Sequence, residues 1–501
     1  MKDLTTSIGK TILARVSGIK LDQKLKTALN KGVVGGVVLF QDNVQSQEQL
    51  FNLIQDIYKN SHHYPIIACD QEGGAVDRFF EVLTPIPSAM SLSAACDPEA
   101  FAKVIDVVLS ELCQIGINCI LAPVLDVVTS ILNPIIGTRA YSDDPDTVCH
   151  YAGKYLEIAR KYNILTVVKH FPGHGSTVED SHLDLAVNPH NIGELLKTDL
   201  YPYTKLASLA DGIMMAHVWT VAIDPQKKPA SISKAVYDYL LYKLNFNGII
   251  FTDDMAMGAI KQNYGINEAC FEAFKAGANY LMLCDDIDTV CAVNSYLNIK
   301  IAFSQELIEM LDKSLTKIET CFKPNRQSAF SLINSNTLQK HYQINLDSAK
   351  SGLCLVKGEL VDLQSIDFLY IPTHHRYNFN LDDMVKQFKT YSFKTEFYKC
   401  DLNNSTLKKL TRLSSNQNIL LVLYRPILNQ NQLKLVNNIQ DLCKNLYIIV
   451  VDVPFGIEKF TGANMVLCCL DPSRLAMQAL AEVLVKQELI HGKLPLMLSL
   501  H

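Results

Sequence analysis

Short apolar runs recur along the first part of the chain, and they are rich in β-branched and long aliphatic side chains. Continuous runs of this length are typical of strands that are buried on both faces of a parallel sheet. We expect eight such strands, at Thr11–Val16, Val33–Phe40, Pro65–Cys69, Ile117–Ala122, Ile164–Val168, Gly212–Ala216, Gly248–Phe251 and Ala278–Cys284.

Most segments between these runs have the periodicity of helices, for example Glu99–Ile115 and Thr147–Tyr162. Alternating strands and helices predict an α/β fold, and eight such units predict a (β/α)8 TIM-like barrel. We expect this barrel to occupy residues 1–325. The polar segment after Cys321 predicts a linker with a peripheral helix, over residues 326–350.

A second set of apolar runs follows the linker and predicts a smaller α/β domain, an α/β/α sandwich over residues 351–501. No glycine-rich phosphate loop accompanies these runs. The helix expected at Pro472–Leu489 is followed by Gly492, which is a typical helix cap. The strands are expected at Ser351–Val356, Ile366–Ile371, Asn418–Tyr424, Leu446–Val453 and Asn464–Leu470.

Polar residues follow directly after several of the barrel runs, where barrel enzymes carry their active sites. A buried charge without a partner costs several kcal/mol, so these residues are unlike core positions. For Asp254 we expect a different role, the start of the following helix. The residues at these run ends are Asp70, Asp126, Lys169, His170, His217, Asp253 and Asp254.

The densest polar cluster is KHFPGHGSTVEDSH, residues 169–182, in which prolines and glycines predict a loop. Asp180 and His182 are two positions apart, so in an extended segment their side chains leave the same face. An aspartate that accepts from one imidazole nitrogen orients the ring, and the other nitrogen then transfers protons near neutral pH. A metal site formed by His170, His174 and His182 is the alternative interpretation.

The sequence KHFPGHG followed by T-x-x-DSH resembles the signature loop of family 3 glycoside hydrolases, specifically of their β-N-acetylglucosaminidase branch. In that branch an Asp-His pair replaces the usual carboxylic acid. The resemblance implies that His182 is the general acid/base and that Asp180 is its partner. It also implies that Lys169 and His170 contact sugar hydroxyls.

Two further segments resemble sugar-binding motifs of the same family. Residues 70–78 read DQEGGAVDR, which implies that Asp70 and Arg78 hold the sugar through charge-assisted hydrogen bonds. Ala75 stands where relatives commonly carry an arginine. Residues 136–145 read IGTRAYSDDP and imply a further sugar-binding residue, Arg139.

The segment FTDDMAM, residues 251–257, is similar to the strand end that carries the nucleophile in this family. The first aspartate of the pair, Asp253, occupies the nucleophile's position. We expect His217 to line the sugar pocket. Trp219, the chain's one tryptophan, is an equal candidate for stacking on a sugar face and for core packing.

Composition and charge limit the classes of protein to which the chain can belong. The chain is 48% hydrophobic and 19% charged, with a formal net charge of -5, which fits a packed enzyme and argues against nucleic acid as a partner. We see no secretory signal and no membrane-spanning run. The 14 cysteines contain no C-x-x-C pair, which favours buried thiols in a reducing cytoplasm.

The resemblance to family 3 implies a retaining exo-β-N-acetylglucosaminidase, and its steps of proton transfer and covalent chemistry need no metal or cofactor. By analogy with that family, the expected substrates are small carbohydrates, such as cell-wall muropeptide fragments in which GlcNAc is joined to anhydro-N-acetylmuramic acid. Three alternatives stay open: a phosphorylase of the same family, a metal-dependent hydrolase and a non-catalytic sugar-binding protein. No sequence feature indicates an oligomeric state.

Overall fold

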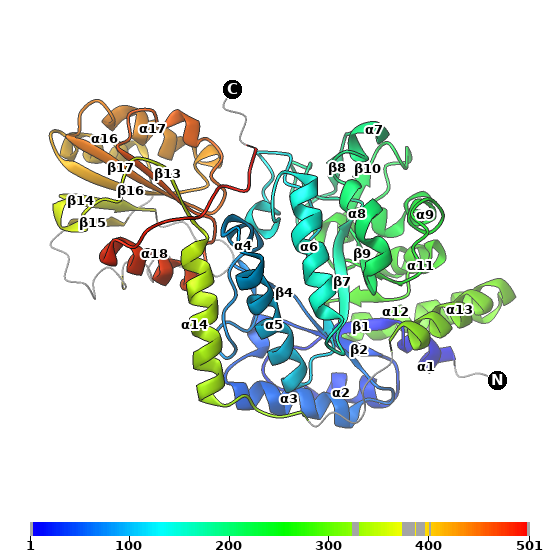
Figure 1. Ribbon diagram of the computed structural model, residues 1–501. Coiled ribbons are helices and arrows are strands. Elements are labelled where there is room, and N and C mark those ends of the chain that lie inside the picture. Colours follow the sequence, from blue (N-terminus) through cyan, green and yellow to red (C-terminus); the bar gives the residue numbers. More distant parts are fainter. Residues whose placement is uncertain (1–3, 323–329, 373–385, 387–395, 400–401, 498–501) are drawn as a thin grey trace.

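The protein has two domains that are joined by a long helix, α14 (Ser335–Ser351), as Figure 1 shows. The computed structural model describes residues 4–322, 330–372, 386, 396–399 and 402–497. The expected linker region therefore contains a regular helix. This helix packs on α5 of the first domain and on α18 of the second.

The first domain is a barrel of eight parallel strands in the order β11-β9-β7-β6-β3-β2-β1-β12. A bridge between Phe251 and Tyr280 brings the two end strands together, so the barrel is nearly closed. All eight strands that the apolar runs predict are present. They are β1 (Ile12–Arg15), β2 (Gly36–Leu39), β3 (Ile66–Cys69), β6 (Cys119–Ile120), β7 (Leu165–Phe171), β9 (Gly212–Met215), β11 (Ile249–Thr252) and β12 (Leu281–Leu283).

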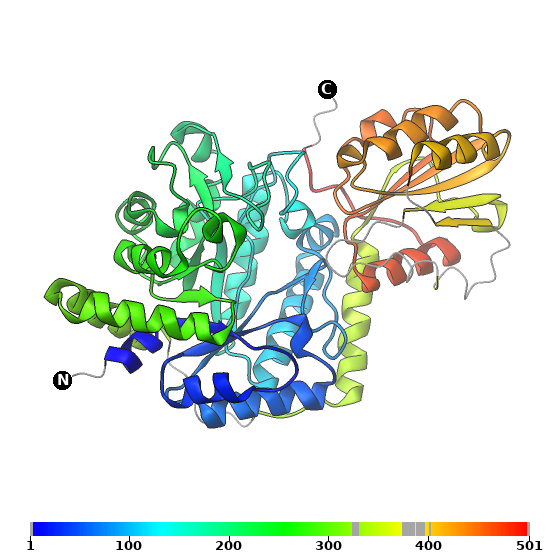
Figure 2. The same ribbon diagram turned by 180° about the vertical axis from the view of Figure 1, so that it is seen from behind.

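Helices surround the barrel and bury their apolar faces against its outer surface (Figures 1 and 2). Helix α5 (Pro98–Ile115) illustrates how local sequence sets the bounds: Asp97 accepts from the first backbone N–H groups, and Gly116 ends the helix in the left-handed region. The other long helices are α2 (Gln23–Asn30), α3 (Gln47–Asn60), α6 (Pro145–Ala159), α11 (Ile266–Ala276), α12 (Ile287–Ala302) and α13 (Gln305–Cys321).

Strand β7 is longer than its apolar run. We expected it to end at Val168, but it continues to Phe171, so Lys169 and His170 belong to the strand. Both side chains are buried. Lys169 pairs with Glu72 and His170 pairs with Asp126, and these contacts offset the cost of burying the two polar groups.

Two small sheets rise from the carboxyl-terminal rim of the barrel. One is the hairpin of β4 (Gln71–Gly73) and β5 (Val76–Asp77). The other pairs β8 (Ala186–Asn188) with β10 (Val218–Thr220) in parallel, and it follows the polar loop of residues 172–185. These elements shape the rim around the barrel mouth.

The second domain is a six-stranded sheet in the order β13-β18-β17-β16-β14-β15, in which only the edge strand β13 runs antiparallel to its neighbour. Apolar clusters cover both faces of the sheet. The sequence predicted every strand except β15. The strands are β13 (Leu353–Lys357), β14 (Phe368–Ile371), β15 (Glu396–Lys399), β16 (Asn418–Tyr424), β17 (Asn445–Val451) and β18 (Met465–Cys469), and the described helices are α16 (Asn404–Leu413), α17 (Gln430–Ile439) and α18 (Arg474–Lys486).

The expected cap of the last helix was wrong. Helix α18 ends at Lys486, and Gln487 adopts the left-handed conformation at its end. Gly492 lies further along, where its backbone packs against the carbonyl groups of Ser351 and Leu353. None of the helices in the described ranges is both long and apolar enough to span a membrane.

Candidate active site

A cavity of about 180 Å³ opens at the carboxyl ends of the barrel strands. Seven residues that the sequence predicted for catalysis or sugar binding line this cavity, and the apolar part of its wall includes Phe40, Met214 and Met257. The seven residues are Asp70, Arg78, Arg139, Lys169, His170, His182 and Asp253.

An ionic cluster forms the base of the cavity. Lys169 Nζ lies 2.7 Å from Asp70 Oδ1 and 2.5 Å from Glu72 Oε1, and its side chain is only 2% exposed. Arg139 forms a two-pronged pair with Glu72, with both contacts at 2.8 Å, and Arg78 lies 3.4 Å from Asp70. These pairs fix the cations with charge-assisted hydrogen bonds.

The cluster keeps its acids ionised. Burial alone would raise the pKa of Glu72, but Arg139 and Lys169 outweigh this effect and lower the pKa to about 2. Burial likewise opposes ionisation of Asp70, and the neighbouring Lys169 and Arg78 bring its pKa well below the usual range. Fixed carboxylates and cations of this kind suit the recognition of sugar hydroxyls.

His170 is oriented by Asp126, which follows strand β6. The Nδ1 atom of His170 donates to Asp126 Oδ2 at 2.6 Å, and Arg139 Nη2 lies 3.3 Å from the Nε2 atom of the same ring. The other oxygen of Asp126 accepts from the backbone N–H of His174 at 2.7 Å. Asp126 therefore ties the end of β7 to the first turn of the loop that follows it.

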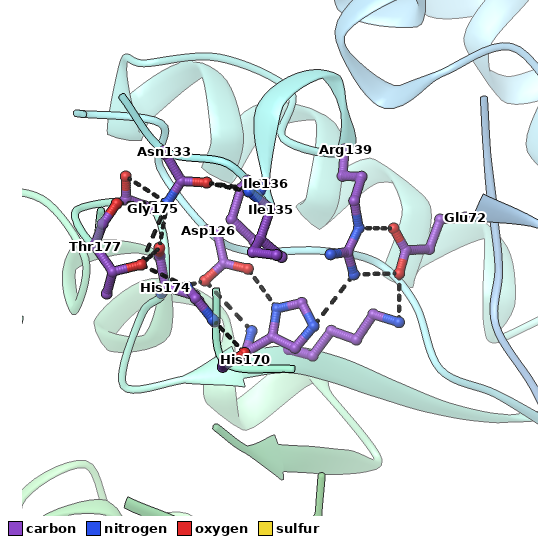
Figure 3. Close-up of polar contacts among 12 residues, drawn as sticks. Glu72, Asp126, Asn133, Ile135, Ile136, Arg139, His170, His174, Gly175 and Thr177 are labelled. Atoms are coloured by element: carbon purple, nitrogen blue, oxygen red, sulfur yellow. Dashed lines mark hydrogen bonds and ion pairs between the residues drawn. The ribbon is translucent and has the colours of Figure 1, made fainter. Parts of the chain in front are cut away.

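Asn133 stabilises the same loop from the side (Figure 3). Its amide nitrogen donates to the carbonyl groups of His174 and Thr177, at 2.8 and 3.0 Å. Its amide oxygen accepts from the backbone N–H groups of Ile135 and Ile136. One buried side chain thus connects the loop of β7 with the turn that carries Arg139.

Asp180 and His182 form the expected pair. Asp180 Oδ1 accepts from the Nδ1 atom of His182 at 2.9 Å and from its backbone N–H at the same distance. The His182 side chain is 53% exposed, whereas that of Asp180 is 17% exposed and does not line the cavity. The loop is docked onto the segment after β11, because Gly258 and Ala259 donate their backbone N–H groups to the carbonyls of His182 and Ser181.

Asp253 and Asp254 both line the cavity, but their side chains have different environments. Asp253 lines the cavity; burial opposes its ionisation, but His217, His170 and the N–H of Asp254 lower its pKa below the usual value. Asp254 Oδ1 accepts from the backbone N–H groups of Ala256 and Cys284, and burial raises its pKa. Asp254 does not begin a helix as we expected, since α10 (Gly258–Lys261) starts four residues later.

His217 does not line the cavity. Its ring is fully buried, with Nδ1 2.7 Å from Ser231 Oγ and Nε2 2.8 Å from the Asp254 carbonyl. His217, which we expected to line the sugar pocket, therefore lies outside the cavity lining and holds the segment of Asp253 and Asp254 through the Asp254 carbonyl. Trp219 also lies outside the cavity lining, and its indole N–H donates to the Asp224 carbonyl.

The three histidines of the alternative metal site have other partners. The two ring nitrogens of His174 lie 2.8 Å from Thr177 Oγ1 and Ser181 Oγ, and the Nδ1 atoms of His170 and His182 face aspartates. Within the described ranges, no group of three or more His, Cys, Asp or Glu side chains is arranged to hold a metal ion.

The sequence interpretation missed three residues of this site: Glu72, Asp126 as the partner of His170, and Asn133. Glu72 lies inside the quoted motif DQEGGAVDR, and Asp126 was noted at the end of an apolar run. Asn133 was missed because the loop carbonyls to which its amide nitrogen donates lie more than 40 residues away in the chain.

Comparisons with known proteins agree with this geometry. Residues 5–320 match the model of the glycosyl hydrolase family 3 N-terminal domain. The beta-hexosaminidase of Stenotrophomonas maltophilia strain K279a is 33% identical over 281 residues, which cover 54% of this chain and 83% of the relative. That of Alkalilimnicola ehrlichii is 35% identical over 294 residues, which cover 57% of this chain and 84% of the relative.

Solved structures extend the likeness to the second domain. A family 3 β-N-acetylglucosaminidase from Paenibacillus sp. FPU-7 matches all of both chains with a TM-score of 0.86 at 24% identity, which shows the shared fold. LpqI of M. tuberculosis, at 27% identity and a TM-score of 0.59, matches 66% of this chain and 96% of its own. The match to the family model spans the whole barrel, and the site lies within it, so this chain belongs to glycosyl hydrolase family 3 and is a glycoside hydrolase that acts on carbohydrate.

Proposed function

We propose that the protein is a retaining exo-β-N-acetylglucosaminidase with Asp253 as nucleophile and His182 as acid/base. The observation that carries this proposal is that both residues line one cavity from neighbouring segments, with the ionic cluster at its base. The likeness to curated beta-hexosaminidases supports the choice of an amino sugar.

In the first step, a carboxylate oxygen of Asp253 attacks the anomeric carbon while the bond to the leaving oxygen breaks. The lowered pKa of Asp253 keeps this carboxylate ionised. The imidazolium of His182 gives its proton to the leaving oxygen, and Asp180 stabilises the charged ring from Nδ1.

In the second step, a water molecule attacks the anomeric carbon of the glycosyl-enzyme. His182 takes the proton from this water, and the bond between the sugar and Asp253 breaks. The anomeric configuration is then inverted twice, so the product retains the configuration of the substrate.

The base of the cavity suits one terminal sugar. Asp70, Lys169 and Arg78 line the cavity with fixed charges, and Arg139, which pairs with Glu72, lines it beside them. We propose that these residues and His170 bind the hydroxyl and acetamido groups of a single GlcNAc. The small volume of about 180 Å³ favours release of sugars from a chain end.

We further propose a cytoplasmic substrate, a cell-wall recycling fragment with GlcNAc joined to anhydro-N-acetylmuramic acid. The free thiols of all cysteines in the described ranges support a reducing compartment. This assignment is tested by comparing kcat/KM for that fragment with kcat/KM for chitobiose, and a preference for chitobiose would contradict it.

An activity panel tests the reaction. Aryl β-N-acetylglucosaminide, β-glucoside and β-xyloside substrates are compared with and without inorganic phosphate, and NMR follows the anomer that is released first. We expect fast cleavage of the GlcNAc substrate alone, release of the β-anomer and no sugar phosphate. A first product of α configuration would contradict retention, and a sugar 1-phosphate would identify a phosphorylase.

A further inference from the structure

Arg425 of the second domain reaches across the domain boundary to the barrel. It lies directly after β16, and its side chain is 6% exposed. Its Nε atom lies 3.0 Å from Asp452 Oδ2, and its Nη1 atom donates to the Pro134 carbonyl at 2.9 Å. The guanidinium therefore joins an acid of its own domain to a backbone oxygen of the barrel.

The backbone around this ion pair is unusual. Arg425 has φ of 44° and Asp452 has φ of 73°, and neither residue is a glycine. Left-handed conformations of such residues are strained and persist only where surrounding contacts hold them. Both residues follow neighbouring strands of the same sheet, so two strained residues lie where the second domain contacts the barrel.

The barrel segment that Arg425 contacts is the turn that carries Arg139. This turn begins at Asn133, whose side chain accepts from Ile135 and Ile136, and it ends in the short helix η2 (Gly137–Arg139). Gly137 has φ of 48°, and a Cβ atom there would lie 2.6 Å from Arg425 Nη2. The guanidinium thus lies directly against the backbone two residues before Arg139.

The apolar side chains of the turn pack in a cluster that the barrel and the second domain share. Ile135 and Ile136 are part of the cluster that contains Val453 and Phe455, on one face of the six-stranded sheet. Arg139 itself points the other way, into the cavity, where it pairs with Glu72 and approaches His170 (Figure 3). One side of the turn is thus fixed by the second domain, and the other side forms the base of the sugar site.

We infer that Arg425 is a positioning residue for the sugar site: it holds the turn of residues 133–139 so that Arg139 enters the cavity at a fixed depth. This gives the second domain a role in substrate binding although none of its described residues lines the cavity. The inference rests on the proposed function, in which Arg139 contacts the sugar.

A double-mutant cycle between Arg425→Lys and Arg139→Met tests the inference. Lysine at position 425 keeps a charge for Asp452 but lacks the planar fork that also reaches Pro134. We expect Arg425→Lys to raise KM for an aryl β-N-acetylglucosaminide about tenfold, because a displacement of about 1 Å can cost up to about a hundredfold and lysine keeps part of the contact. In the Arg139→Met background the same change should leave kcat/KM unaltered.

Three controls separate the outcomes. Arg474→Lys is the matched variant, since Arg474 pairs with Glu81 across the same boundary at an exposed position, and its KM should equal that of the wild type. Thermal melting reports folding. If Arg425→Lys does not fold, the variant Arg425→Met with Asp452→Asn removes both charges of the pair and is measured in its place.

The possible failures are distinguishable. Unchanged KM in Arg139→Met contradicts the sugar contact of the proposed function. A raised KM in Arg139→Met, together with an unchanged KM in Arg425→Lys or with additive effects in the double variant, leaves the proposed function intact and overturns the role of Arg425.

Discussion

Gly258 donates its backbone N–H to the carbonyl of His182 at 3.1 Å, and Ala259 donates to Ser181 in the same way. The segment that follows Asp253 is therefore hydrogen-bonded to the loop that carries the proposed acid/base, His182. A Cβ atom at Gly258 would lie 2.5 Å from the His182 carbonyl oxygen and 2.7 Å from that of Leu183. The close approach of the two segments requires a glycine at this position.

The first prediction follows from this contact. Gly258→Ala should push the loop away and lower kcat about tenfold or more, because the proton donor is displaced from the leaving oxygen. Gly265→Ala is the matched control, since no atom lies within 4 Å of the Cβ position there. Equal kcat in Gly258→Ala and the wild type, measured on an alkyl β-N-acetylglucosaminide, would show that docking of the loop is irrelevant to catalysis.

The second prediction separates the two catalytic roles. Asp253→Ala should reduce kcat at least about a thousandfold on every substrate, because no glycosyl-enzyme forms. His182→Ala should slow the first step about a hundredfold to ten-thousandfold on alkyl glycosides but spare it on aryl glycosides with acidic phenols, which leave without a proton. Pre-steady-state release of the phenol measures this step. The same loss with both kinds of leaving group would remove His182 from the acid role.

The third prediction concerns the partner of the imidazole. Asp180→Asn keeps the size of the side chain but removes the negative charge that faces His182 Nδ1 at 2.9 Å. The imidazolium is then less stable, so the basic limb of the profile of kcat/KM against pH should move to lower pH, and kcat should fall. A basic limb at the wild-type position would contradict the pairing.

The fourth prediction uses the buried ionic cluster. Arg139 and Lys169 overcome the burial of Glu72 and lower its pKa from 4.5 to about 2, so the folded state binds the proton of Glu72 less readily than the unfolded state does. The stabilisation is therefore complete above about pH 4.5 and is lost as the pH falls toward 2. The difference in melting temperature between the wild type and Glu72→Gln should shrink from pH 5 to pH 3. A constant difference over that interval would contradict the ion pairing.

The barrel could be predicted from the sequence because each of its strands is a buried apolar run, which leaves a continuous local signal. The hydrophobic pattern did not predict the end of a strand where polar side chains are buried by tertiary contacts. The end of β7 was placed too early, since Lys169 and His170 look like loop residues until their ion pairs with Glu72 and Asp126 are known.

Some residues of the candidate site could be predicted from the sequence, and others could not. Motif residues that point into the cavity, such as Asp70, Arg139 and Asp253, have strong sequence signals, and the structure brings them together. His217 was given a sugar contact because it follows a strand, but its ring turns inward to Ser231 and to the carbonyl of Asp254. Side-chain direction depends on partners far along the chain, and no local pattern encodes it.

The pairing of β8 with β10 has a consequence for the loop that carries the proposed acid/base. The loop between Phe171 and Ala186 begins at the end of barrel strand β7. Its other end is held by the β8–β10 pairing, and β10 follows the neighbouring barrel strand β9. Both Asp180 and His182 lie between these two fixed ends, and Asp180 accepts from the backbone N–H and from the Nδ1 atom of His182. The proposed proton donor and its partner are therefore held in one short, doubly anchored segment.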